Sequence, residues 1–474
     1  MTNNSLDQMT LHAIGGGWGD GLPGPTKQRV SVIRGTDIPR LRLGDFSTVP
    51  VRFESEKKVK NRLLQNGDIV IEISGGSAAS GQHTGRALLI TEEMLENLGG
   101  KVIPASFCRL LRLDQRKVDP AFVVYQIDEL HLSGEIAEFE NQSTGISNFQ
   151  FNRFLQDIEP RIKNPSIQRL ISISLQNLDK KIVLNLRINQ TLETMAQAIF
   201  KSWFVDYDPV KAKIAAIEQG EDSLRVTMRA ISGKTDVELD QMPREHYDQL
   251  AAIVALFPNA MEDSKLGEIP TGWEVKPISD LVETVGGSTP NTKNESYWNP
   301  AEYFWTSPKD LSNATSPVLL KTERKISALG LSTISSGLLP VGTLLMSSRA
   351  PIGYLAITQV PLAINQGYIA MPPGGKLSPL YLLMWCQQNM DVIKGQANGS
   401  TFMEISKKAF RPILALFPKK ALVDGFISFA DPIFRTIVSN SQEIIYLSKV
   451  RDTLLPELLA GDLSVDELLE EDAQ

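Results

Sequence analysis

The sequence predicts an α+β protein with two strand-rich domains, related by an internal repeat and separated by a long antiparallel coiled coil of two helices. Three observations carry this prediction. Segments of the second half match segments of the first in the same order. Short apolar runs, such as "GDIVIEI" and "GTLLMSS", alternate with loops rich in Gly, Ser and Asn, which is typical of strands and turns. Each strand-rich part is followed by a stretch whose apolar residues recur every three or four positions, which is typical of a helix.

The repeat extends over most of the chain. The corresponding segments are "IGGGWGDG" and "VGGSTP", "RVSVIRGTDIPR" and "EYFWTSPKDLSN", "LLQNGDIVIEISGGSAASGQHTGRALLI" and "LLPVGTLLMSSRAPIGYLAI", "KVDPAFVVYQI" and "KLSPLYLLMWC", and "AEFENQSTGISNFQFNRFLQDIEP" and "GQANGSTFMEISKKAFRPILALFP". Because the order of the segments is the same in both halves, we expect the two domains to share one topology.

The glycine run "AIGGGWGDG" at 13–21 is a candidate phosphate-binding loop. Such a loop needs a strand before it and a helix N-terminus after it, because the free N–H groups of the helix hold the anion. Neither is expected here, since the chain continues into "LPGPTKQRVSVIRGTDIP", and the Lys-Ser/Thr ending of a P-loop is missing. The second glycine run at 286–287 favours a turn or close backbone approach that leads into each strand-rich domain.

The two helical stretches share one spacing, which predicts that they pack along a common seam. Two unrelated amphipathic helices, each on a local core, are the alternative. Asn185 and Asn440 occupy equivalent positions, and a polar residue in an apolar seam lowers stability but fixes the register. The expected seam residues are Leu178, Ile182, Asn185, Leu192, Ile199 and Trp203 in the first helix and Ile433, Ile437, Asn440, Leu447 and Leu454 in the second.

These patterns predict five consecutive parts. They are a strand-rich domain over 1–160, a long helix over 161–208, a connector with a short helix near 243–255 over 209–262, a second strand-rich domain over 263–418, and a second long helix with an acidic tail over 419–474.

Composition and charge exclude several classes of protein. No run of about 18 apolar residues appears and the start "MTNNSLDQMT" does not resemble a signal peptide, so we expect a cytoplasmic protein. Two cysteines, Cys108 and Cys386, and four histidines cannot supply a disulfide framework or a typical zinc site. The net charge of -7 argues against attraction of nucleic acid by the whole surface, but it permits local basic patches.

Several longer segments are distinctive: "INQTLETMAQAIFKSWFVDYDPV", "DSKLGEIPTGWEV", "WTSPKDL", "LLPVGTLLMSSRAPIGYLAI", "AINQGYIA", "ANGSTFMEISKKAFRPI" and "RDTLLPELLAGDL". In this order they resemble the specificity subunit of type I restriction-modification systems, in which two target recognition domains alternate with two helices. The resemblance covers nearly the whole chain. The first copy departs from the usual pattern in "SGGSAASGQHTGRALLI", which is longer than its counterpart, as expected if the two domains read different sequences.

The resemblance implies a noncatalytic, sequence-specific DNA-binding subunit. Each recognition domain would read one half of a bipartite, asymmetric target in double-stranded DNA, while the helices set the spacer and dock two methyltransferase subunits and the restriction subunits. No cofactor is then expected in this chain, and S-adenosylmethionine, ATP and Mg²⁺ are expected in the partner subunits.

The sequence also lacks the motifs of a catalytic subunit. It contains no Asn/Asp-Pro-Pro-Tyr/Phe run, no P-loop and no recognisable nuclease carboxylate cluster, and its histidines (His12, His83, His131 and His246) lie far apart. We therefore predict no catalytic and no metal-binding residue. A protein-interaction scaffold with two repeated ligand-binding domains is the main alternative function.

Base readout needs polar side chains on loops that reach the edges of the grooves. Ser348, Arg349 and the "NGST" loop stand out because equivalent polar loops interrupt both copies, although any one such loop could simply be solvated. The aromatic run around Phe200, Trp203 and Phe204 follows the helical seam, which favours packing over base stacking. The predicted DNA contacts are Lys57, Lys58, Lys60, Arg62, Gln82, His83, Arg86, Gln142, Ser143 and Thr144 in the first copy and Asn291, Lys293, Ser307, Lys309, Ser348, Arg349, Asn398, Ser400, Thr401 and Lys407 in the second.

Overall fold

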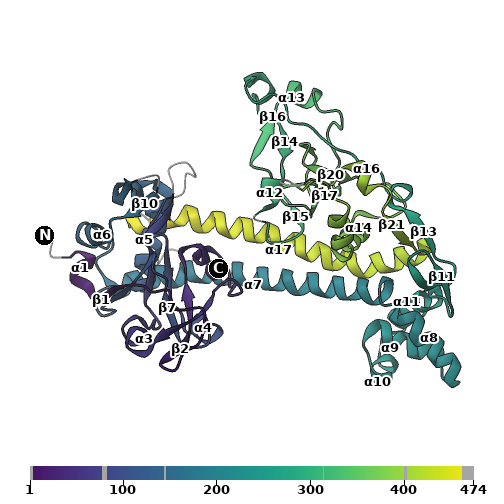
Figure 1. Ribbon diagram of the computed structural model, residues 1–474, viewed down its shortest axis with the longest axis horizontal. Coiled ribbons are helices and arrows are strands. Elements are labelled where there is room, and N and C mark those ends of the chain that lie inside the picture. Colours follow the sequence, from purple (N-terminus) through teal and green to yellow (C-terminus); the bar gives the residue numbers. More distant parts are fainter. Residues whose placement is uncertain (1–3, 77–82, 144–145, 313, 400–402, 462–474) are drawn as a thin grey trace, which may run out of the picture. The chain divides into compact units, whose positions relative to one another are not determined.

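The computed structural model describes residues 4–76, 83–143, 146–312, 314–399 and 403–461 (Figure 1). The chain forms two compact units, Met1–Leu184 with Glu443–Gln474 (unit 1) and Asn185–Gln442 (unit 2). Each unit contains both helices and strands, so the predicted α+β class is confirmed. Among the described residues, no helix is both long and apolar enough to cross a membrane.

Unit 1 contains the first strand-rich body, body 1, which is built from three small sheets. The main sheet has the order β1 (Thr10–Gly15), β8 (Cys108–Leu113), β4 (Ile69–Glu72), β6 (Ala87–Leu89); the second has β3 (Val51–Ser55), β2 (Lys27–Ile33), β7 (Val102–Pro104); the third has β5 (Ser74–Gly76), β10 (Ile146–Phe149), β9 (Glu140–Ser143). The helices of body 1 are α1 (Leu6–Met9), α2 (Ile38–Arg42), α3 (Glu56–Arg62), α4 (Glu92–Asn97), α5 (Pro120–Ser133) and α6 (Phe151–Asp157). Apolar residues of β4 and β8 pack with α5 and α6 in one buried core.

Unit 2 contains the second strand-rich body, body 2. Its main sheet has the order β15 (Val318–Leu319), β18 (Leu355–Thr358), β17 (Leu344–Ser347), β20 (Tyr368–Met371); its second has β16 (Arg324–Ile326), β14 (Tyr303–Thr306), β19 (Leu362–Ile364); β13 (Glu274–Pro277) pairs with β21 (Leu414–Phe417). Its helices are α12 (Pro308–Ser312), α13 (Ala328–Ser332), α14 (Pro379–Gln388), α15 (Met390–Gly395) and α16 (Lys407–Phe410). The hairpin of β11 (Met261–Ser264) and β12 (Gly267–Pro270) precedes the body.

The strand pairing of the two bodies matches, which confirms the internal repeat. In body 1, β2 lies between antiparallel β3 and parallel β7, and in body 2, β14 lies between antiparallel β16 and parallel β19. In the main sheets, β4 lies between antiparallel β6 and β8, as β17 lies between antiparallel β18 and β20. The helix that follows the last strand of each main sheet starts equivalently, because Asp119 caps α5 and Ser378 caps α14 through their side chains.

The two glycine runs make the same close backbone approach. A Cβ atom on Gly16 would overlap with the carbonyl oxygens of Pro104 and Ala105, and one on Gly287 would overlap with that of Ile364. The next residue donates its backbone N–H to the same segment, Gly17 to Pro104 and Ser288 to Ile364. The expectation that no strand precedes the first run was wrong, since β1 leads into it, but β2 and not a helix follows. The run is therefore a packing turn.

Two long helices, α7 (Pro165–Phe204) and α17 (Lys420–Ala460), belong partly to each unit (Figure 1). Within unit 1, Asp179 and Lys181 of α7 form ion pairs with Arg451 and Glu443 of α17, respectively. Because the α7 residue nearer the N-terminus meets the α17 residue nearer the C-terminus, the helices pair in antiparallel orientation, as predicted.

The connector differs from the prediction of one short helix. The expected helix near 243–255 is present as α11 (Arg244–Leu256). Three further helices precede it, α8 (Asp208–Gln219), α9 (Ser223–Ser232) and α10 (Asp236–Asp240). α9 and α10 pack with α11 around Met228, Leu239 and Val254, and Lys213 of α8 donates to the carbonyl of Val254. Charged residues interrupt their apolar patterns, and Asp222 and Thr235 cap α9 and α10.

Candidate functional site

The structure brings together two of the predicted contact loops of body 2. Ser348 and Arg349 follow β17 directly, and Arg349 pairs with Glu404 as an antiparallel β-bridge. The backbone N–H of Ile405 donates to the carbonyl of Ser348, and Asn398 pairs with Glu404 on the other side. Three short backbone segments therefore lie side by side at the end of the main sheet. Ser400 and Thr401 lie outside the described residues.

Body 1 has the equivalent arrangement. β5 follows β4 and pairs with β10, so that Asn148 lies opposite Ser74. The backbone N–H of Phe149 donates to the carbonyl of Ile73, just as that of Ile405 donates to Ser348. The same edge of each body is thus built from the same strands, while its side chains differ.

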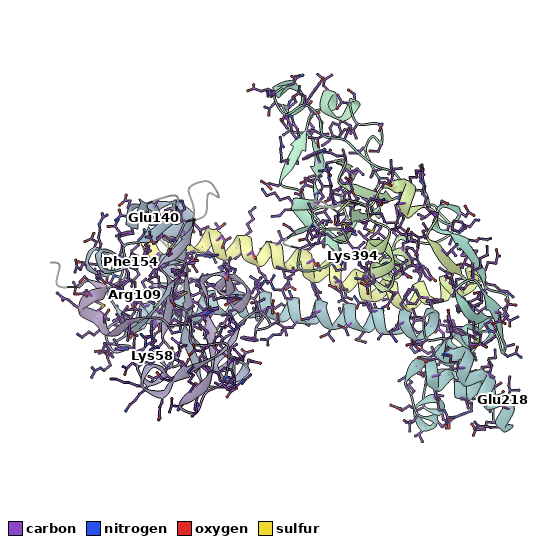
Figure 2. The ribbon with its side chains drawn as sticks, in the orientation of Figure 1. Lys58, Arg109, Glu140, Phe154, Glu218 and Lys394 are labelled. Atoms are coloured by element: carbon purple, nitrogen blue, oxygen red, sulfur yellow. The ribbon has the colours of Figure 1, made fainter. Side chains whose placement is uncertain are left out.

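Arg349 lies at the rim of a pocket of about 720 Å³ in body 2. Its guanidinium Nη1 is 3.7 Å from Glu404 Oε2 and its side chain is 38% exposed, so the ion pair is weak and partly open to solvent. Lys394, labelled in Figure 2, also lines this pocket and forms no ion pair with a described residue. Ser348, by contrast, is only 3% exposed, which leaves its hydroxyl poorly placed to reach a base.

The lysines of α3 form an exposed cationic group in body 1. Lys57, Lys58 and Lys60 are exposed, while Val59 between them is buried against β2 and β7. Lys58, labelled in Figure 2, lies 3.3 Å from Glu54, whereas Lys57 and Lys60 form no ion pair with a described residue. Arg62 donates from Nε to the carbonyl of Gly15, so it holds the glycine turn.

The loop before β6 is held by two acidic residues. His83 Nδ1 lies 3.0 Å from Glu140, whose other oxygen accepts from the hydroxyl of Thr84. Arg86 donates twice to Glu72, at 2.8 and 2.7 Å, and these hydrogen bonds raise the pKa of its guanidinium above the ordinary value. Glu72 therefore engages two donors of Arg86 and fixes its guanidinium against the body.

The remaining predicted contacts of body 1 are Gln82, Gln142, Ser143 and Thr144. Gln82 and Thr144 lie outside the described residues. Gln142 and Ser143 belong to β9, but their side chains are not among those the structure describes.

In body 2, the predicted contacts in the loops before and after β14 are exposed or locally paired. Asn291 Oδ1 accepts from the backbone N–H of Lys293, whose ammonium is exposed. Ser307 donates its backbone N–H to Asp310, which caps α12, and Lys309 forms an exposed ion pair with Glu323. Lys407 of α16 lies against Gly286, beside the second glycine turn.

Sequence reasoning missed three cations that the fold brings to these surfaces. In body 1, Arg109 lies over the ring of Phe151, and Arg153 lies over Phe139. In body 2, Arg324 stacks on Trp298 with its guanidinium carbon 3.5 Å from the ring centroid. Arg109 is half-buried between the buried Cys108 and Leu110 of β8, so its side chain points away from the core. A polar residue between two apolar ones is the signal that the sequence carries for it.

The expected seam residues lie along α7 and α17 as follows. Ile182, Asn185, Trp203 and Ile437 are buried, and Leu178, Leu192, Ile199, Ile433, Asn440, Leu447 and Leu454 are half-buried.

One polar contact in the seam joins the predicted Asn440 to Asn189, one helical turn after Asn185. Asn440 donates to Asn189 Oδ1 at 2.9 Å, and Asn189 lies 3.3 Å from the hydroxyl of Ser441. Phe200, Trp203 and Phe204 are buried against Phe426, so their rings serve packing.

The described residues contain no group of three or more His, Cys, Asp or Glu that could hold a metal ion. His12 contacts the carbonyl of Asn61, and burial lowers the pKa of His131 below its ordinary value.

Comparison with known proteins identifies the family. Residues 270–419, which cover body 2, match the model of the type I restriction modification DNA specificity domain. The HindI specificity subunit of Haemophilus influenzae is 32% identical over 353 residues, which cover 70% of this chain and 76% of that protein. The MjaIX specificity subunit of Methanocaldococcus jannaschii is 37% identical over 159 residues, or 33% of this chain and 37% of that protein.

Among solved structures, the crystal structure of the type I restriction-modification system S subunit from M. genitalium gives a match. It has a TM-score of 0.49 and 11% identity, and the match covers 97% of each chain. The family assignment rests on the relatives in sequence, of which the first is matched over most of its length. The chain belongs to the specificity subunits of type I restriction enzymes, which are noncatalytic.

Proposed function

We propose that body 1 and body 2 each read one half of a bipartite, asymmetric target in double-stranded DNA. The observation that carries this proposal is that the two bodies share the same backbone pairing at one edge but place different side chains on it. At the matching edge, body 1 has Ser74 opposite Asn148, and body 2 has Arg349 opposite Glu404. Base readout depends on the donors and acceptors that a fixed framework presents to a groove, so different side chains at equivalent positions suit different half-sites.

The exposed cations near these edges support a role on DNA. Arg349 and Lys394 line one pocket of body 2, and Lys57 and Lys60 lie on an exposed face of body 1. Arg and Lys supply most contacts to phosphates and to guanine, and a few clustered cations suffice for a local patch on a protein of net charge -7. The predicted residues that are neither buried nor paired remain the proposed contacts.

The proposal assigns the long helices a role between the two readers. Pairing of α7 with α17 fixes the register of the helices, and the Asn189–Asn440 contact suits only one register. We assign to this helix pair the unread spacer of the target and the docking of two methyltransferase subunits and the restriction subunits. S-adenosylmethionine, ATP and Mg²⁺ would then be bound by those subunits, which act in the cytoplasm.

A map of methylated adenines in the source cell, with and without this gene, tests the proposal. Loss of methylation at one split, asymmetric motif is expected, and that motif gives both half-sites and the spacer. An unchanged map in a strain that expresses the neighbouring methyltransferase would contradict DNA specificity and favour a protein-interaction scaffold.

A single substitution tests which body reads which half. Arg349→Ala is expected to weaken binding to DNA with an intact body 2 half-site by about 1–3 kcal/mol, because a base contact is lost. Binding measured by fluorescence anisotropy at fixed salt should not change for the other half-site. Lys265→Ala, which removes an exposed cation from the β11–β12 hairpin, is the control. Equal loss on unrelated sequences would reduce Arg349 to a phosphate contact.

A further inference from the structure

Unit 2 contains a polar pocket of about 380 Å³ that the proposed reading of DNA does not use. It is lined by Glu193 of α7, Gln387 of α14, the segment after α12 that includes Thr315, and the start of β18 at Leu355. None of the described residues that line it is Lys, Arg or His. We call it the Glu193 pocket.

Two acceptor oxygens in the Glu193 pocket have no partner. Oε1 of Glu193 and Oε1 of Gln387 are both buried, and neither accepts a hydrogen bond from a residue that the structure describes. Burial raises the pKa of Glu193 to about 7. A buried carboxylate without a donor is unfavourable for the free chain, so its presence points to a donor that comes from outside.

Body 1 shows what an equivalent place looks like when it is filled. Asp128 of α5 corresponds to Gln387 of α14, since both lie eight residues after the Pro that begins the helix. Arg42 donates to both oxygens of Asp128, at 2.7 and 2.9 Å. Its guanidinium also donates to the carbonyl of Ala87, at 2.5 Å.

The other walls of the two places also correspond. Ala87 pairs with Ile71 of β4 as Leu355 pairs with Met346 of β17, at the start of the equivalent strands β6 and β18. Arg42 lies five residues after Asp37, and Thr315 lies five residues after Asp310, the two aspartates that accept the backbone N–H groups of Arg34 and Ser307. Body 2 therefore keeps the acceptors but lacks the arginine.

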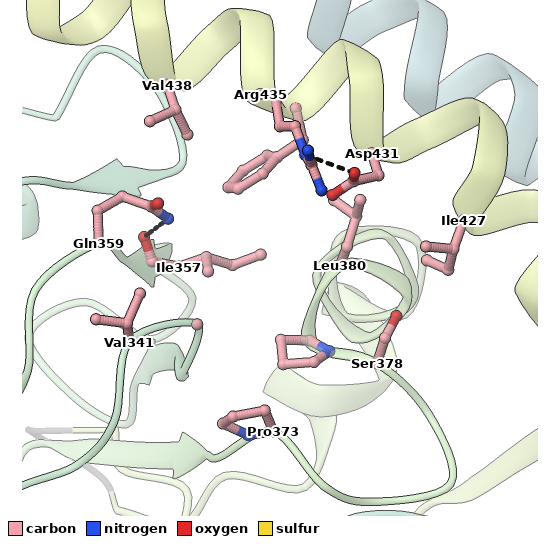
Figure 3. A pocket seen from close by; sticks show the side chains of 13 residues that line it. Val341, Ile357, Gln359, Pro373, Ser378, Leu380, Ile427, Asp431, Arg435 and Val438 are labelled. Atoms are coloured by element: carbon pink, nitrogen blue, oxygen red, sulfur yellow. Dashed lines mark hydrogen bonds and ion pairs between the residues drawn. The ribbon is translucent and has the colours of Figure 1, made fainter.

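A second pocket of unit 2 shows that orphaned oxygens are not a general property of its surface. This pocket, also about 380 Å³, lies between body 2 and α17 and is lined mainly by apolar residues such as Val341, Leu380 and Val438 (Figure 3). Its charged residues, Asp431 and Arg435, pair with each other at 2.7 Å. Only the Glu193 pocket combines burial with unpaired acceptors among the pockets described in unit 2.

We propose that the Glu193 pocket receives an arginine side chain of a bound protein partner, whose guanidinium replaces in unit 2 the contacts that Arg42 makes in unit 1. A guanidinium suits it because its planar fork can donate to a carboxylate, an amide oxygen and a carbonyl at once, as Arg42 does. The choice of a methyltransferase subunit as the partner rests on the proposed function; the chemistry of the pocket does not.

Assembly of the full chain with its methyltransferase subunits tests the proposal. Glu193→Gln keeps the shape but removes the charge, and it is expected to weaken assembly at least about tenfold, because an incoming cation loses its counter-charge. Glu218→Gln, at an exposed glutamate of α8 labelled in Figure 2, is the matched control and should assemble like the wild type. Normal assembly of Glu193→Gln would overturn the proposal.

A second variant fills the pocket from within. Thr315→Arg gives unit 2 its own arginine at the position that corresponds to Arg42, and it is expected to raise the melting temperature of the free chain and to weaken assembly. Thr271→Arg, at an exposed turn, adds the same charge elsewhere and should do neither. Weakened assembly with both variants would indicate a general charge effect and contradict the proposal.

A probe without a partner separates this proposal from the proposed function. Methylguanidinium, compared with neutral methylurea, should raise the melting temperature of the wild type relative to that of Glu193→Gln and Thr315→Arg. The same rise in melting temperature in all three chains would contradict a guanidinium site in the Glu193 pocket. If the wild type responds but does not assemble with methyltransferase subunits, the proposed docking fails and the pocket stands with another partner.

Discussion

Body 1 and body 2 share their central strand pairings but are held together by different polar groups. In body 1, buried acids of the main sheet pair with arginines: Glu72 with Arg86 and Asp68 with Arg112. At the corresponding positions of body 2, Ser347 binds the backbone at Pro351 and Tyr354, and Thr343 binds the carbonyl of Pro340. The apolar strands therefore determine the topology, while the polar positions can change from charged to neutral without changing it.

The difference has an energetic consequence. A buried ion pair contributes little net stability but becomes strongly unfavourable when one partner is removed, because the other charge stays buried. A hydroxyl bound to the backbone is worth about 1 kcal/mol and leaves no charge behind when it is lost. Matched substitutions in the two bodies should therefore have unequal effects.

The largest effect is expected at the buried acid of body 1. Glu72→Gln should lower the free energy of unfolding of unit 1 by about 3–5 kcal/mol, since Arg86 keeps its charge without a counter-charge. Ser347→Ala in body 2 should lower that of unit 2 by about 1 kcal/mol. Urea unfolding followed by hydrogen exchange reports on each unit separately. Equal losses of unfolding free energy in the two units would contradict the difference between the ion pairs of body 1 and the hydroxyl hydrogen bonds of body 2.

The glycine turns should instead respond equally. Gly16→Ala and Gly287→Ala each place a Cβ atom on a backbone carbonyl, and each is expected to destabilise its own unit by about 2–3 kcal/mol. Gly21→Ala, where a Cβ atom meets no atom nearby, is the control. A large loss in one body and none in the other would break the equivalence of the turns.

The last effect depends on pH and concerns Glu193 of unit 2. Burial raises the pKa of Glu193 to about 7 from its ordinary value of 4.5, so the folded chain binds the proton more tightly than the unfolded chain. This contribution is fully present below pH 4.5 and is lost as the pH rises through 7. Glu193→Gln should therefore be more stable than the wild type by about 2–3 kcal/mol at pH 8 and similar to it near pH 4.5. Equal stability at pH 8 would show that the carboxylate is solvated in the free chain.

Features that depend on local pattern were predictable from the sequence. The order of repeated segments predicted one topology for the two bodies, and apolar spacing predicted α7, α17 and α11. The helices α8 to α10 were missed because they are short and rich in charge, and the packing around Met228 and Leu239 that holds α9 and α10 is tertiary.

The candidate sites were less predictable, because they depend on contacts between residues far apart in the chain. Nothing near Arg86 in the sequence shows that Glu72 would occupy its guanidinium, and Arg109 needs Phe151 beside it to be noticed. The pairing of Asn440 with Asn189 depends on the stagger of the two helices, which the spacing of either helix alone does not fix.

The contact that Arg42 makes in body 1 is present at any protein concentration, because the donor and the acceptor belong to one chain. A contact supplied by another molecule obeys mass action, and its contribution to stability falls to zero when that molecule is scarce. Unit 2 would then be the weaker part of any chain made in excess over its partners, and the first to open to cellular proteases. Unit 1 has its own arginine, Arg42, whereas unit 2 would depend on an arginine of its partner. The lifetime of the subunit would therefore depend on how much of its complex forms.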